Sequence, residues 1–262
     1  MEGCLATHDI GGMAYDPEIA SQYRPIGILG GSSAEAALAL AQQILIHARA
    51  LLPIGSRTDQ SAPRILLLSD PRLGASMDIA RHERYVRRVV IEGLEFLCSK
   101  CAHVAIACNT LNFFGQDPEI AERFSNVVWF QDVLGRLIDN DHHKEFTMYG
   151  IRSVVAYPYS HSPYRLVLDQ NDHRISTVDV TELVERVKTG EHSATKAYLK
   201  QRLRDDPRTA IIACTDLSFL NVDARNSPDY IDLVQAVSET LASKAKVDWM
   251  CANGAALASD KP

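Results

Sequence analysis

Two segments of this 262-residue chain resemble each other more closely than they resemble their surroundings. Residues 105–113 read AIACNTLNF and residues 211–219 read IIACTDLSF, so the two copies are offset by 106 positions. In each copy an apolar stretch typical of a buried strand ends on a cysteine, and small polar residues follow where a helix would begin. A unit of this kind that occurs twice predicts an α/β fold made of two similar halves.

Strand-like and helix-like segments alternate along the whole chain, which favours parallel sheets. The predicted strands are residues 26–29, 64–68, 103–107, 127–130, 146–151 and 209–213, with a further apolar stretch at 154–156. The predicted helices are residues 37–52, 79–100, 133–138, 180–188, 193–203 and 230–244. Ser32 stands three residues before Glu35, which is the spacing of a capping box, so Ser32 is the predicted start of the first helix.

The predicted elements divide into two halves. The first half comprises residues 25–130 and 229–250 and carries Cys108. The second half comprises residues 131–228 and carries Cys214. Ligands of open parallel sheets bind beyond the carboxyl ends of the strands. Two halves related by a pseudo-two-fold axis would therefore turn both sulfur atoms toward one shared cleft.

The composition argues against several classes of protein. A hydrophobic fraction of 46% with 23% charged residues is typical of a folded globular chain, and a net charge of −6 argues against a nucleic-acid partner. No apolar run reaches the roughly 18–20 residues that cross a bilayer, which argues against a membrane partner. Residues 1–24 lack the cationic start and apolar stretch of a secretory signal, and we expect them to form a flexible leader. Six cysteines without regular spacing fit free thiols in a reducing compartment, so we expect a cytoplasmic protein.

Two thiols that face one cleft suit proton transfer at carbon. The pKa of an ordinary thiol is about 8.5. A helix N-terminus that lowers the pKa of one of the two cysteines therefore gives one thiolate and one thiol at neutral pH. Of Cys108 and Cys214, one would remove a proton from a carbon acid while the other returns a proton to the opposite face. The candidate groups that hold the substrate and stabilise the carbanion are Asn109, Thr110 and Thr215. Asp216 is expected either to orient a neighbouring group or to modulate a thiol. The alternative, that both cysteines are small buried hydrophobes, explains a matched pair less well.

Three short motifs resemble those of the cofactor-independent aspartate/glutamate racemase superfamily. They are IGILGG at 26–31, Cys108-Asn109-Thr110 and Cys214-Thr215-Asp216, and the resemblance in order and spacing covers residues 25–250. It implies two similar parallel-sheet α/β halves related by pseudo-two-fold symmetry, an active site in the cleft between them, and a homodimer. It also implies that Cys108 and Cys214 are the acid–base pair and that the small polar residues after them hold the α-carboxylate. An enzyme of this kind needs neither a cofactor nor a metal ion.

The chain departs from this family at positions that bind substrate. Relatives usually carry an Asp-Arg pair after the second strand, whereas residues 70–76 read DPRLGAS, so Arg72 is the predicted substitute for that arginine. The Gly-Gly turn makes Gly31 and Ser32 candidates for binding an anion through backbone amides, although a plain capped turn explains them equally well. His161 belongs to an aromatic and polar cluster at residues 157–164, which is either a packed loop or part of the pocket.

These features predict a cofactor-independent amino-acid racemase that inverts the α-carbon of a small-molecule substrate, with an acidic amino acid as one candidate. Two alternatives stay open. The first is an epimerase, isomerase or decarboxylase of another carboxylic acid on the same fold. The second is a protein that binds a small acid without catalysis. Two matched cysteines favour two-sided proton transfer over decarboxylation, which can work with one thiol.

Overall fold

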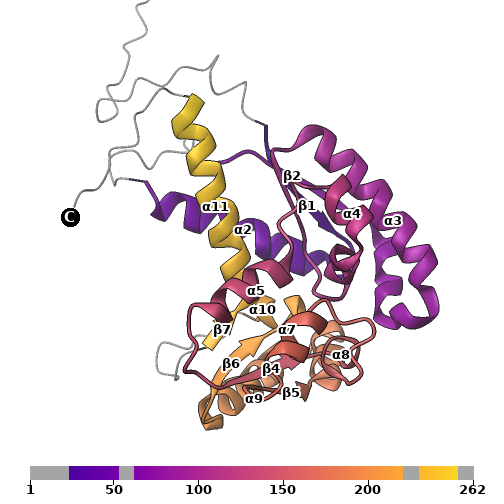
Figure 1. The fold of residues 1–262 in the computed structure, drawn as a ribbon, viewed down its shortest axis with the longest axis vertical. Helices are drawn as coiled ribbons and strands as arrows, with labels where there is room; N and C mark the ends of the chain where they lie inside the picture. The colour runs from indigo at the N-terminus through magenta and orange to yellow at the C-terminus, as the bar shows by residue number, and fades with distance from the viewer. Residues whose placement is uncertain (1–23, 53–61, 221–229, 253–262) are drawn as a thin grey trace, which may run out of the picture.

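The computed structural model describes residues 24–52, 62–220 and 230–252. These residues form two parallel β-sheets surrounded by helices, with the strand order β2-β1-β3 in the first sheet and β5-β4-β6-β7 in the second (Figure 1). The predicted α/β class with two parallel sheets is confirmed. Within the described residues, no helix is both long enough and apolar enough to cross a membrane.

The first sheet and its helices occupy the indigo and magenta part of Figure 1. Its strands are β1 (Ile26–Gly30), β2 (Ile65–Ser69) and β3 (His103–Ile106). The helical elements that follow them in the chain are α2 (Ala34–Ala50), η3 (Pro71–Asp78), α3 (Ile79–Lys100), η4 (Thr110–Gln116), α4 (Pro118–Arg123) and α5 (Phe130–Asp139).

The second sheet repeats the same arrangement of strands. Its strands are β4 (Phe146–Gly150), β5 (Ile175–Asp179), β6 (Thr209–Ile212) and β7 (Tyr230–Asp232). The helices of this part are α6 (Arg152–Val155), α7 (Arg165–Gln170), α8 (Thr181–Lys188), α9 (His192–Asp205), α10 (Thr215–Phe219) and α11 (Leu233–Ala252). In both sheets the first strand lies between the second and the third, so β3 and β6 occupy equivalent places.

The first strand is buried on both faces because a helix packs on each side of the sheet. Ile26 and Ile28 belong to one core cluster with Leu40 of α2, whereas Leu29 belongs to a second cluster with Leu94 of α3. Successive side chains of a strand point to opposite faces, so an uninterrupted apolar strand is what this double cover requires.

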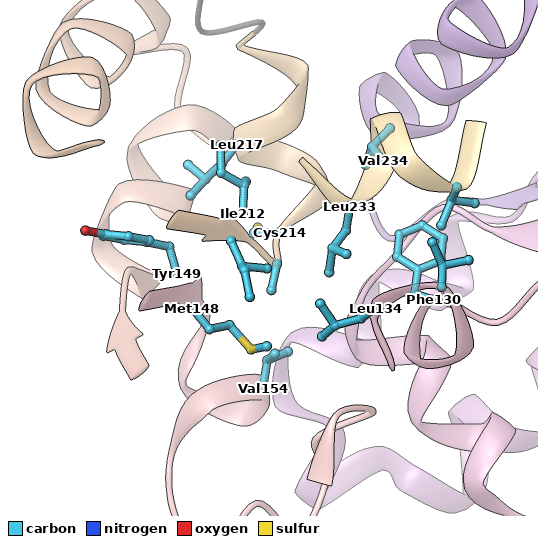
Figure 2. Close-up of a cluster of buried hydrophobic side chains, with 14 of the residues drawn as sticks. Phe130, Leu134, Met148, Tyr149, Val154, Ile212, Cys214, Leu217, Leu233 and Val234 are labelled. Atoms are coloured by element: carbon cyan, nitrogen blue, oxygen red, sulfur yellow. The ribbon is translucent and has the colours of Figure 1, made fainter. Parts of the chain in front are cut away.

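One core cluster joins the two halves. It contains Leu40 of α2, Leu134 of α5, Met148 of β4 and Ile212 of β6, and Figure 2 shows the part around the last three. The last helix, α11, packs against α2 and is the yellow helix that crosses it in Figure 1. A shared, close-packed core holds the two sheets in a fixed relative placement.

Four predictions about elements were wrong or incomplete. Only Val127 of the predicted strand 127–130 pairs with β3, through an isolated parallel bridge to Val104, and the chain enters α5 at Phe130. Residues 154–156 fall largely within the short helix α6. The segment 230–244, predicted as one helix, begins with the strand β7 and continues into α11. The sequence patterns did not predict β5. Both β5 and β7 are edge strands of the second sheet, and their partly exposed residues lack a continuous apolar run.

The limits of the two halves stay a prediction. β7 adds to the second sheet beside β6, whereas α11 packs on α2 of the first. The predicted leader, residues 1–24, lies outside the described residues except for Arg24.

Candidate active site

Cys108 and Cys214 lie at equivalent points of the two sheets. Cys108 comes two residues after the end of β3, and Cys214 comes two residues after the end of β6. A helical element begins close behind each cysteine, η4 at Thr110 and α10 at Thr215. Both cysteines are buried, with exposed fractions of 7% and 6%. The repeat in the sequence therefore corresponds to a repeat in the fold.

The two sulfur atoms share one electrostatic environment. A charge on Cys108 raises the pKa of the Cys214 thiol, and charges on both cysteines raise the pKa of the Tyr164 phenol, after the larger effect of burial. Tyr164 is fully buried. One buried phenol whose pKa is raised by both cysteines indicates that Cys108 and Cys214, 106 positions apart in the sequence, lie in the same region of the molecule.

Burial raises the pKa of both thiols, but the surroundings favour the thiolate at Cys108. Hydrogen bonds from the Ser32 side chain and the Leu111 N–H lower the pKa of Cys108 relative to burial alone, and the positive charge of Lys188 lowers it further. The Asp216 carboxylate opposes these effects and raises the pKa of Cys108. Cys214 lies within the apolar cluster of Figure 2, where burial raises its pKa most and the nearby Asp216 carboxylate raises it further.

Asn109 carries a buried amide group with an unused donor. The Tyr164 hydroxyl donates a hydrogen bond to Asn109 Oδ1. Asn109 Nδ2 is buried and has no hydrogen-bond partner among the described residues. Because the phenol occupies the oxygen, the amide nitrogen next to Cys108 is left to donate to a third group.

A side chain four residues after each cysteine contacts the carbonyl of that cysteine. Asn112 Nδ2 donates to Cys108 O at 2.9 Å, and Asn112 Oδ1 accepts from Phe130 N at 3.0 Å. Ser218 Oγ lies 3.2 Å from Cys214 O and 2.7 Å from Asp232 Oδ1. The sequence analysis missed both positions, although the alignment of the two segments sets Asn112 opposite Ser218.

Lys188 is a second residue that sequence patterns missed. It lies at the end of α8, its Nζ donates to Ser32 O at 3.3 Å, and it lies 3.9 Å from Asp216 Oδ2. Burial raises the pKa of Asp216, and Lys188 opposes that shift. In a sequence, a lysine at the end of an amphipathic helix is usually interpreted as a charge exposed to solvent. Only the fold shows that Lys188 contacts Ser32 of the first half and Asp216 of the second.

The fold matches solved structures of aspartate and glutamate racemases. Picrophilus torridus aspartate racemase superposes with a TM-score of 0.65 at 20% identity, covering 85% of this chain and 94% of that one. Campylobacter jejuni glutamate racemase gives 0.59 at 18% identity, covering 84% and 85%. Francisella tularensis glutamate racemase in complex with D-glutamate gives 0.57 at 16% identity, covering 91% and 85%. No family model and no curated protein matches the sequence.

The chain shares the fold of these aspartate and glutamate racemases. Within this fold, the turn after β1 shows why glycine is needed at Gly31. Its φ is +124°, and a Cβ there would lie 1.9 Å from the backbone oxygen of Asp70. Ser33, not Ser32, is the N-cap of α2 and accepts from Ala36 N at 3.3 Å. Ser32 Oγ lies 2.9 Å from Ser76 Oγ instead, and its side chain bonds to the first thiol.

Two side chains predicted for the site, Arg72 and His161, contact carboxylates of the chain itself. Arg72 contacts Asp70 at 2.6 Å and Glu92 at 3.1 Å, and its side chain is 48% exposed. His161 Nε2 lies 3.3 Å from Glu83 Oε2. The other predicted residues, Asn109, Thr110, Thr215 and Asp216, are buried directly after the two cysteines.

Iodoacetamide should alkylate Cys108 before Cys214, and the rate at Cys108 should still rise with pH beyond the ordinary pKa of a thiol. Alkylation requires the thiolate, and a raised pKa makes the thiolate fraction at neutral pH smaller than in the unfolded chain. Peptide mass spectrometry across a pH series measures both rates, with guanidinium-unfolded protein as the reference. Faster modification of Cys214, or a plateau at lower pH than in the unfolded reference, would contradict this order.

Proposed function

We propose that this protein is a cofactor-independent amino-acid racemase that uses Cys108 and Cys214 as its two acid–base groups. One observation carries the proposal. Two buried thiols follow equivalent strands of the two sheets, and charges on both of them raise the pKa of the same buried phenol, Tyr164. The fold shared with aspartate and glutamate racemases supports an isomerase that acts on an amino acid.

The proposed reaction moves one proton off the α-carbon and another onto it. The Cys108 thiolate removes the α-proton and becomes a thiol. The electron pair of the broken C–H bond stays on the α-carbon and is delocalised into the adjacent carboxylate. The Cys214 thiol then donates its proton to the opposite face, which leaves a thiolate at Cys214 and inverts the centre. The reverse reaction begins at Cys214. Lys188 and Ser32 favour the first thiolate, and Asp216 keeps the second thiol protonated.

The α-carboxylate of the substrate fits the unused donors beside the thiols. Asn109 Nδ2 is a buried donor without a partner among the described residues. The N–H groups of Asp216 and Leu217 lower the pKa of Cys214 by hydrogen bonding, so they also lie beside its sulfur. Donors fixed in advance stabilise the extra charge that develops on the carboxylate when the α-proton leaves. Thr110 and Thr215 supply further buried hydroxyl groups. The predicted homodimer stays a prediction.

Hydrogen–deuterium exchange tests the proposed reaction. Purified protein in heavy water, without pyridoxal phosphate, should exchange the α-proton of its substrate and racemise it, as read by proton NMR and chiral chromatography across a panel of amino acids. Exchange without inversion would indicate a different reaction on the same fold. Neither exchange nor inversion with any amino acid would contradict the proposal and favour a small-acid-binding protein.

Tyr164→Phe should lower kcat/KM by about 2- to 10-fold, mainly through a higher KM, because Asn109 loses the hydrogen bond that fixes its amide. Steady-state kinetics and a denaturant titration measure activity and stability together. Tyr149→Phe is a matched control, since it removes a hydroxyl bonded to Asp206 in the second sheet. Equal activity losses in the two variants would show that Tyr164 has no specific effect at the site.

A further inference from the structure

Two oppositely charged side chains, Lys188 and Asp216, change the pKa values of the thiols and lie close to each other. Lys188 and Asp216 both act on Cys108, and Asp216 also acts on Cys214. Their closest atoms are 3.9 Å apart, and the side chains are 29% and 11% exposed. Charged hydrogen bonds are about 2.7–2.9 Å long, so this pair is open and each member retains capacity for a further partner.

The two basic side chains predicted for the site already contact carboxylates of the chain. Arg72 is held by Asp70 and Glu92, and His161 pairs with Glu83. Glu35 adds a further negative charge near the site, because its charge contributes to the raised pKa of Asp216. A second carboxylate of a substrate would lose its hydration next to these acids without gaining a further cation among the described residues.

Several of the described residues next to the two cysteines carry uncharged polar side chains. Asn109, Thr110 and Thr215 are buried directly after the cysteines, and the fully buried Tyr164 lies where it senses both sulfur atoms. The amide and hydroxyl groups of these residues can hydrogen-bond a neutral polar side chain, but they cannot neutralise a charged one.

From this arrangement we infer that the site takes an amino acid with an uncharged side chain, bound as a zwitterion between Lys188 and Asp216, in preference to a dicarboxylic amino acid. The substrate carboxylate lies toward Lys188 and Asn109 Nδ2, and the ammonium group lies toward Asp216. The inference rests on the proposed function and narrows it. It differs from the expectation that Arg72 holds the distal carboxylate of an acidic substrate.

Pairs of amino acids that share a shape and differ in charge test the inference. The wild-type protein is assayed by α-proton exchange in heavy water with asparagine against aspartate and glutamine against glutamate, together with alanine and serine. We expect the best neutral substrate to exceed the better dicarboxylic acid in kcat/KM by at least about 10-fold. Aspartate or glutamate as the best substrate would overturn the inference and leave the racemase proposal intact. Exchange with no amino acid would overturn the racemase proposal, and the inference with it.

A charge variant tests the cause of the preference. Asp216→Asn should raise the ratio of kcat/KM for aspartate over asparagine by about 10-fold, because one negative charge beside the substrate is gone. Glu185→Gln, on the exposed surface of α8, removes one negative charge elsewhere and should leave the ratio unchanged. An unchanged ratio in Asp216→Asn, or an equal change in both variants, would overturn the assignment of the preference to the negative charge of Asp216.

Discussion

Cys108→Ser and Cys214→Ser should each reduce the rate of racemisation by about 10²- to 10⁴-fold, which is the usual contribution of one acid–base group. A serine hydroxyl is nearly the size of a thiol but a far weaker acid, so the packing at the ends of β3 and β6 is preserved while proton transfer is lost. Chiral chromatography of each enantiomer measures the rates, and circular dichroism verifies that the variants fold.

Each single variant should still exchange the α-proton of one enantiomer with deuterium, and the two variants should prefer opposite enantiomers. The thiol that remains faces only one side of the carbon, so it can remove a proton and return a deuteron there without inversion. Cys98→Ser is the matched control, because Cys98 lies half-buried on α3 and its pKa is raised to about 11. Normal turnover in both Cys108→Ser and Cys214→Ser would refute the two-thiol reaction.

Lys188→Met should lower kcat/KM by about 10- to 100-fold, because a hydrogen bond to a charged group contributes about 1.5–3 kcal/mol. Methionine keeps much of the length of the side chain and removes its charge. The same substitution should slow alkylation of Cys108 at a given pH, since Lys188 lowers the pKa of that thiol relative to burial alone.

A lysine elsewhere on the second half provides the control for this experiment. Lys196→Met, on α9, removes one positive charge from another helix and should leave kcat/KM and the alkylation rate unchanged. Wild-type kinetics in Lys188→Met would exclude Lys188 from binding the substrate carboxylate. Equal losses in both variants would point to the net charge of the protein as the cause.

Elements with strong internal signals were predictable from the sequence. The apolar positions of α3 recur every three or four residues and face the sheet, and its observed bounds, Ile79–Lys100, are the predicted ones. Edge strands gave no such signal: β5 reads ISTVD, and its polar residues are tolerated because one side of the strand has no neighbour. At Val127 the apolar pattern was genuine, but the chain leaves the sheet after one bridge.

The two candidate thiols and the polar residues directly after them were predictable because the sequence repeats around them, whereas the contacts that reach them from distant segments were not. Tyr164 reaches Asn109 from 55 residues away, and Lys188 reaches Ser32 from 156 residues away, so neither contact leaves a local pattern. Arg72 looked available in the sequence because its second partner, Glu92, lies one helix further along the chain.

Whether Cys108 and Cys214 act on opposite faces of one α-carbon is tested most directly by the position of deuterium early in the reaction. A single enantiomer is incubated with the wild-type protein in heavy water, the reaction is stopped after a small fraction has converted, and both enantiomers are separated and analysed by mass spectrometry. Two thiols on opposite faces predict that the newly formed enantiomer carries deuterium while the remaining starting enantiomer still carries protium. Equal labelling of both enantiomers, or a product that retains the original proton, would contradict a pair of facing thiols.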